Sequence, residues 1–332
     1  MRKRTVDLRA HPLLDVASYG RSGPGGGRSL TLTDIAYVRR TVSRAPEVMI
    51  KVSGGARSLR GVRSHLDYIG REGRGAIETD DGMGIQEKGF EKALVEDWDL
   101  DLDVLGRHTE RAIAAGRKPP KLVHNLVFSM PNSTPPDKLQ RAVRVFAREK
   151  FGFQHRYVMA LHTDQGHPHV HMVVRAMSEE GKRLTIRKAT LREWRHDFAK
   201  HLREQGVAAN ATERAVRGEI RSRKTDGIHR AMMRGDSFHH HNRLAAAAKP
   251  LANGVPADAS GSERMVNTRK AVVAGWRAVA TMLDSQGERE LAAHVMRFVD
   301  RMPPPRTEQE SLTVRTQGRS HPENDHHRGL TR

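Results

Sequence analysis

The chain has 332 residues, a formal net charge of +19 and no cysteine, with 37% hydrophobic and 5% aromatic residues. Disulfides and thiolate metal sites are therefore excluded, which leaves histidine as the main soft metal ligand. The basic excess predicts a polyanionic partner, with DNA or RNA first and an acidic membrane surface second. No run of 18 or more apolar residues and no apolar signal segment occur, so we expect a cytoplasmic protein without membrane insertion.

The predicted organisation begins with a basic arm rich in glycine and serine. Residues 1–45 contain GRSGPGGGRS and are expected to be flexible. The main folded domain is expected at 46–218. A basic linker (219–262), a helical segment broken at Gly287 (263–302) and a polar, disordered tail (303–332) are expected to follow.

Apolar periodicity predicts the elements of the main domain. In chain order they are a strand (47–52), a helix (57–72), a long loop containing the acidic run EDWDLDLD (96–103), a strand (122–130), a helix (137–149), strands at 156–162, 169–177 and 182–188, and a helix that opens with a capping box from Thr190 to Glu193. Successive strands joined by short turns indicate an antiparallel sheet. We therefore expect an α+β fold, a central antiparallel sheet with the helices segregated to one side and a small helical C-terminal segment.

The stretch HTDQGHPHVH carries a candidate metal site. His169 and His171 share a strand face, and a hairpin turn would bring His162 beside them. Three imidazoles without a fourth ligand make an open site that accepts Zn, Mn, Ni or Co, and we expect Mg or Mn to be the ion that supports activity. Asp164 could orient a ligand imidazole or act as a base, and His167 ranks below the other three as a ligand. The alternative is a strand that carries histidines by chance, but burying unpartnered imidazoles is costly.

Tyr68 lies off the apolar stripe of the predicted helix at 57–72, so its side chain projects from the polar side. Arg63, Arg71 and Arg74 are expected around it as phosphate ligands. Periodicity alone leaves open that Tyr68 is only an exposed structural residue.

Three motifs, in this order, resemble those of conjugative relaxases in the histidine–hydrophobe–histidine (HUH) endonuclease superfamily. They are RSLRGVRSHLDYIGREG (57–73), HNLVFSMPNSTPPDKL (124–139) and HTDQGHPHVHMVV (162–174), and the resemblance covers roughly residues 48–218. The match is closest to the MOBP-type branch that contains the T-DNA border endonuclease. The resemblance implies a nucleophile at Tyr68, metal ligands at His162, His169 and His171, an acidic position at Asp164 and a DNA contact at Ser129.

The resemblance implies an enzyme that nicks one DNA strand at an origin of transfer. Tyr68 would form a 5′-phosphotyrosine bond, with a divalent metal stabilising the phosphate charge. The implied partners are single-stranded or supercoiled DNA at that origin, relaxosome accessory proteins and a type IV secretion coupling protein. Export into a recipient cell together with the DNA is also implied.

Three other functions remain open from the sequence. A rolling-circle replication initiator shares the chemistry, but such proteins usually place the tyrosine after the histidine motif, whereas Tyr68 precedes His162. A hydrolytic metal nuclease would cleave without a covalent intermediate. A DNA-binding accessory protein with a zinc-stabilised hairpin would bind DNA without nicking it.

Overall fold

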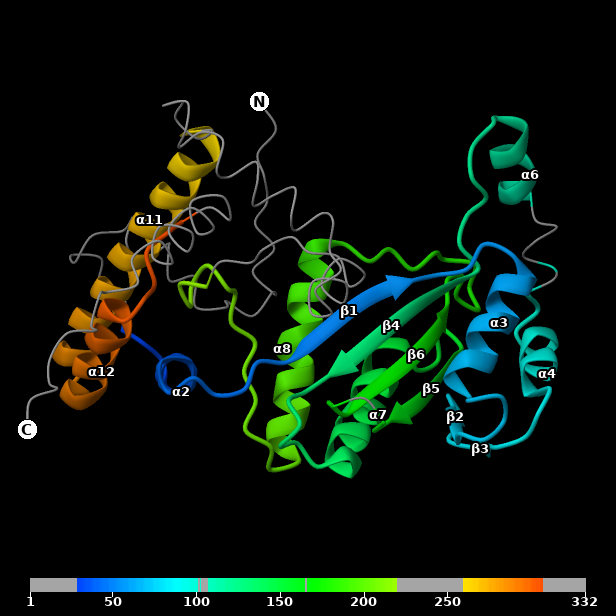
Figure 1. Ribbon diagram of the computed structural model, residues 1–332, viewed down its shortest axis with the longest axis horizontal. Helices are drawn as coiled ribbons and strands as arrows, with labels where there is room; N and C mark the ends of the chain where they lie inside the picture. The colour runs from blue at the N-terminus through cyan, green and yellow to red at the C-terminus, as the bar shows by residue number, and fades with distance from the viewer. Residues whose placement is uncertain (1–28, 101, 103–106, 165, 220–258, 307–332) are drawn as a thin grey trace, which may run out of the picture. The chain divides into compact units, whose positions relative to one another are not determined.

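The computed structural model describes residues 29–100, 102, 107–164, 166–219 and 259–306 (Figure 1). The chain divides into two compact units. The sheet unit is Ser43–Ala211, and the helical unit combines the segments on either side of it, up to Val42 and from Thr212. None of the described helices has the length and apolar character needed to cross a membrane.

A six-stranded antiparallel sheet forms the centre of the sheet unit, in the order β1–β4–β6–β5–β2–β3. The strands are β1 (Met49–Gly54), β2 (Ile77–Thr79), β3 (Gly84–Ile85), β4 (Val123–Ser129), β5 (Tyr157–His162) and β6 (His169–Arg175) (Figure 1). Every residue of β6 is buried. A strand buried on both faces needs covering layers on both sides of its sheet.

Helices α7 (Pro136–Phe151) and α8 (Lys188–Glu204) cover one face of this sheet. The ring of Phe128 on β4 meets Phe146 of α7 and Phe198 of α8 edge-on, at centroid distances of 5.1 and 5.2 Å. Such edge-to-face pairs stabilise a core beyond the burial of their area.

Helices α3 (Leu59–Ile69) and α4 (Phe90–Asp97) cover the opposite face. Val62, Leu66 and Ile69 of α3 share a buried cluster with Val158 and Val173 of the sheet. The predicted α+β fold with a central antiparallel sheet is confirmed. The expectation that the helices lie on one side is wrong, because β5 and β6 are apolar on both of their alternating faces.

Three expectations about single elements also need correction. The predicted strand at 182–188 is limited to one bridge, between Met177 and Arg183. Helix α8 begins at Lys188, and the Thr190 hydroxyl accepts a hydrogen bond from the Arg187 N–H, so the capping box lies three residues earlier than expected. The predicted long loop contains β2, β3, α4 and α6 (Arg107–Ala114).

The helical unit contains α2 (Leu32–Val42), α11 (Ala259–Ser285) and α12 (Arg289–Asp300). Val38, Trp276 and Phe298, one from each helix, belong to its buried core. The expected flexible arm is therefore wrong for residues 32–42, whereas the predicted break at Gly287 separates α11 from α12. The rest of the arm (1–28), most of the linker (220–258) and the tail from 307 lie outside the described residues.

Candidate metal and tyrosine site

The histidine cluster forms where β5 and β6 pair. His162 lies directly opposite His169, and His171 follows two positions later on the same face. The three rings lie 4.6–5.4 Å apart between centroids, and one ligand nitrogen from each lies within 4.8 Å of the others. At most 9% of each residue is exposed. The hairpin therefore assembles three buried imidazoles that could hold one metal ion.

Backbone carbonyls orient two of the three rings. His162 donates from Nε2 to the Ile69 carbonyl at 2.8 Å, and His169 donates from Nδ1 to the His167 carbonyl at 3.0 Å. Each bond fixes a tautomer and leaves the other ring nitrogen as an acceptor. His167 thus contributes through its backbone and lies outside the cluster.

His171 provides the test of whether the site fits a metal. Within the described residues, its buried Nδ1 has no hydrogen-bond partner. Burial, and then the neighbouring His162 and His169, lower the pKa of His171 to about 3. A buried nitrogen without a partner is costly, and a neutral imidazole is the form that binds metal. The donor set therefore fits a divalent ion with open coordination positions.

Arg71 links the cluster to Asp164. Its Nη2 lies 2.6 Å from both Asp164 carboxylate oxygens and 3.1 Å from His162 Nδ1. Desolvation opposes the charged form of Asp164, but its own backbone N–H and Arg71 lower its pKa overall. The carboxylate therefore remains charged and holds the guanidinium beside the histidines.

A left-handed turn at the end of α3 positions Arg71. Arg71, Glu72 and Gly73 have φ angles of 53, 56 and 81°. Side-chain-bearing residues rarely adopt this conformation, so the surroundings must impose the turn. Gly73 is required there, since a Cβ would approach the Glu87 and Lys88 backbone to 2.7 Å.

Tyr68 stands above the cluster on the last turn of α3 and is 50% exposed. Its ring centroid lies 5.8 Å from that of His171 and 6.5 Å from that of His162. His65, one turn earlier, stacks on the Tyr68 ring at 5.9 Å with an interplanar angle of 23°. The candidate nucleophile is thus exposed to solvent at its site beside the buried imidazoles.

The remaining predicted residues differ in their distance from Tyr68. Ser129 lies directly opposite His169 on β4, so it borders the cluster. Arg74 is close in sequence and donates from Nε to the Arg71 carbonyl. Arg63 precedes Tyr68 by five positions, which puts it about 140° away around the helix. The structure therefore does not bring Arg63 beside Tyr68.

Two groups at the site were given no role from the sequence. His65 is expected on the same helix face as Tyr68, because a residue three positions earlier lies on the same side of a helix. The Ile69 carbonyl could not be identified from the sequence, because its bond to His162 depends on how α3 docks on the sheet.

Comparison with known proteins gives three findings. Residues 91–207 match the family model described as "Relaxase: MobA/VirD2-like, nuclease domain". The T-DNA border endonuclease VirD2 of Rhizobium radiobacter is 24% identical over 205 residues, which cover 57% of this chain and 47% of the relative. The chain thus spans about half the length of that curated relative. A solved structure described as "Molecular Basis of Vancomycin Resistance Transfer in Staphylococcus aureus" is 13% identical with a TM-score of 0.32, covering 51% of this chain and 99% of that one.

Proposed function

We propose that this chain, whose residues 91–207 match a MobA/VirD2-like relaxase nuclease domain, nicks one DNA strand at an origin of transfer through a phosphotyrosine intermediate. The observation that carries this proposal is the position of Tyr68, exposed and within ring contact of two buried histidines. Phosphoryl transfer needs a nucleophile and a charge-stabilising site in reach of the same phosphate.

The proposed reaction exchanges one phosphate ester for another. The Tyr68 hydroxyl oxygen bonds to the scissile phosphorus, and the bond from phosphorus to the 3′-oxygen breaks. The phenol loses its proton and the departing 3′-oxygen gains one, which leaves a 3′-hydroxyl and a 5′-phosphotyrosine. The ester bond is conserved for later rejoining of the strand.

The residues around Tyr68 have distinct proposed roles. Neutral imidazoles of His162, His169 and His171 would hold a divalent ion, Mg or Mn for activity or Zn, which would supply Lewis-acid stabilisation of the phosphate. Binding at His162 would use Nδ1 and would therefore displace its contact with Arg71. Arg71 offers a guanidinium to the phosphate oxygens. Because Asp164 is committed to Arg71, we assign Asp164 a positioning role and not that of the base.

The remaining proposed contacts concern DNA. Ser129 borders the cluster on β4 and could donate its hydroxyl to a phosphate of the bound strand. Arg74 lies on the turn beside Tyr68 with 78% of its side chain exposed, which suits a backbone contact. Arg63 would contact DNA only along the other flank of α3. The net charge of +19 supplies salt-dependent affinity for single-stranded or supercoiled DNA.

A denaturing gel tests the proposal directly. The protein is incubated with Mn or Mg and end-labelled single-stranded DNA spanning a candidate origin, beside Tyr68→Phe and the control Tyr37→Phe. We expect label to migrate with the wild type and with the control, and to vanish with Tyr68→Phe. Nicked DNA without an adduct, unchanged by Tyr68→Phe, would identify a hydrolytic nuclease and refute the proposed nucleophile.

The proposed cellular role follows from the same reaction. The protein would act in the cytoplasm with relaxosome accessory proteins, be recognised by a type IV secretion coupling protein and enter the recipient attached to DNA. A mating assay checks this role: Tyr68→Phe should abolish transfer of a plasmid that carries the origin, while Tyr37→Phe should support it.

A further inference from the structure

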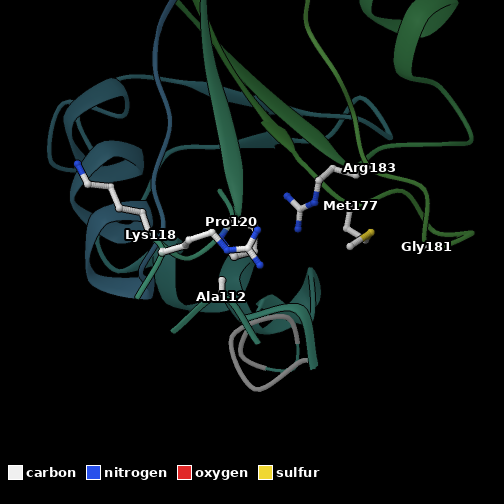
Figure 2. A pocket seen from close by; sticks show the side chains of 7 residues that line it. Ala112, Lys118, Pro120, Met177, Gly181 and Arg183 are labelled. Atoms are coloured by element: carbon white, nitrogen blue, oxygen red, sulfur yellow. The ribbon is translucent and has the colours of Figure 1, made fainter. Parts of the chain in front are cut away.

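A second basic site lies in the sheet unit, at the end of the sheet opposite the histidines. Figure 2 shows a cavity between the segment after β6, with Met177 and Arg183, and the segment before β4, with Lys118 and Pro120. Its volume is about 420 Å³, and its lining residues are Ala112, Arg117, Lys118, Pro120, Met177, Gly181 and Arg183. Three of them are cationic and none is acidic.

The cations of this cavity are available to a ligand. The nearby acids Glu179 and Glu180 are already paired, with Arg175 at 3.1 Å and Lys182 at 2.8 Å. Arg183 points into the cavity in Figure 2 while its Nη1 donates to the Lys121 carbonyl at 2.7 Å. A guanidinium has five donors, so a single backbone bond leaves most of them for an anion.

Arg117 and Lys118 line the opposite side of the cavity, where Figure 2 shows the Lys118 side chain extended away from Arg183. Arg117 and Lys118 are exposed, and neither has an acidic partner among the described residues. The adjacent Pro119 carbonyl accepts a hydrogen bond from Arg57, which precedes α3. The start of α3 is thereby tied to the loop that carries the two unpaired cations.

An exposed stripe on α3 connects this cavity with Tyr68. Arg60, Ser64 and Tyr68 are exposed and recur at steps of four, the spacing of one helix side, and Arg57 is exposed just before the helix. From Arg60 to Tyr68 the rise is ~12 Å at the helical rise per residue. Arg57 and the stripe together contain two cations and no acid, so a polyanion could follow them from the cleavage site to the cavity.

We propose that the cavity lined by Arg117, Lys118 and Arg183 is a second phosphate-binding site, which holds the backbone of the DNA strand bound at Tyr68. The inference rests on the proposed nicking function, since it takes the same strand as its ligand. Contacts to phosphates fix the register of a nucleic acid without reading its bases. The cavity would therefore anchor the strand a fixed distance from the scissile phosphate.

Oligothymidylates of increasing length, titrated against the full chain by fluorescence anisotropy, test this site. Wild-type affinity should rise stepwise once the strand reaches from the histidine cluster to the cavity. The variant Arg117→Gln/Lys118→Gln/Arg183→Gln should lose that step, so its affinity for the longer oligomers should fall by on the order of tenfold. The slope of log affinity against log salt concentration should decrease by about 2 in magnitude. Its affinity for the shortest oligomer should stay unchanged. Arg117→Gln/Lys118→Gln, which leaves the Arg183 bond intact, should lose most of the step.

The control Lys138→Gln/Arg141→Gln/Lys200→Gln removes three charges from α7 and α8, which cover the other sheet face. An equal loss in this control, or an equal loss at every oligomer length, would overturn the proposal. The proposal would also be overturned if the wild type bound thymidine monophosphate and the triple cavity variant did not, because the cavity would then be a site for free nucleotides. Adduct formation on origin DNA is measured separately. If no adduct forms but affinity still rises stepwise with oligomer length, the nicking function is refuted and the cavity proposal stands.

Discussion

Gly70, the residue that ends α3, lies against the core at a position where a single methyl group should be costly. An added Cβ would lie 2.7 and 2.8 Å from two ring atoms of Phe90 and 3.1 Å from Cδ1 of Ile77. Carbon atoms in contact normally stay 3.5–4.0 Å apart, so the ring must move by about 1 Å. Phe90 and Ile77 are 3% and 1% exposed, which leaves little room for that movement.

The expected cost of Gly70→Ala follows from two opposing effects. Overpacking of a core typically costs about 1–3 kcal/mol. The φ of Gly70 is −80°, which alanine adopts without strain. Alanine also lowers the conformational entropy of the unfolded chain, which stabilises the folded state by about 0.4–1 kcal/mol. We expect the free energy of unfolding to fall by about 1–2 kcal/mol, measured by urea titration with far-UV circular dichroism.

Two further proteins decide whether the Phe90 contact is the cause. Gly84→Ala is the control, because its Cβ would meet nothing within 4 Å. In a Phe90→Leu background the clashing ring atoms are absent, so Gly70→Ala should cost less than about 0.5 kcal/mol. A cost that stays the same in that background, or that Gly84→Ala shares, would refute the steric argument.

Three shorter predictions concern the site and its surroundings. His171→Ala should lose bound divalent metal in elemental analysis and His167→Ala should keep it, because only the former removes an imidazole from the cluster. Arg71→Gln should lower adduct yield by about tenfold or more, because it removes a guanidinium from the phosphate site. It should lower the free energy of unfolding by less than about 1 kcal/mol, since the ion pair of Arg71 with Asp164 is exposed. Arg74→Gln should have a smaller effect on adduct yield. Burial lowers the pKa of His124 to about 4 from 6.5, so the unfolded state binds the proton first and stability falls as pH drops from 6.5 to 4. That loss is at most about 3 kcal/mol, and urea titrations across this range should show a weaker pH dependence for His124→Gln.

The histidine hairpin could be predicted because everything that forms it is local in the chain. Strand alternation puts His169 and His171 on one face, and turn-forming residues fold His162 back beside them. The docking of α3 could not be predicted in the same way. The stacking of His65 on Tyr68 is indicated by their three-residue spacing on one helix. The bond from His162 to the Ile69 carbonyl requires the packing of α3 on a distant strand, which no local pattern indicates.

The errors in the fold have equally specific causes. Leu184 and Ile186 alternate as in a strand and pack against the core, but the pattern does not reveal whether a neighbouring strand is available for pairing. In α2, Ile35, Val38 and Val42 recur at helical steps. The glycine-rich composition before them favoured a flexible arm over that short signal.

The helical unit takes one helix from before the sheet unit and two from after it, which bears on how the protein folds during synthesis. The sheet unit can begin to fold while translation continues, since domains fold as their residues emerge. The apolar side of α2 cannot pack at that stage, because its partners α11 and α12 are synthesised about 220 residues later. Until then Val38 and its neighbours are exposed to chaperones and proteases. A chain that ends before α11 would therefore keep the residues of the sheet unit but leave the apolar side of α2 exposed.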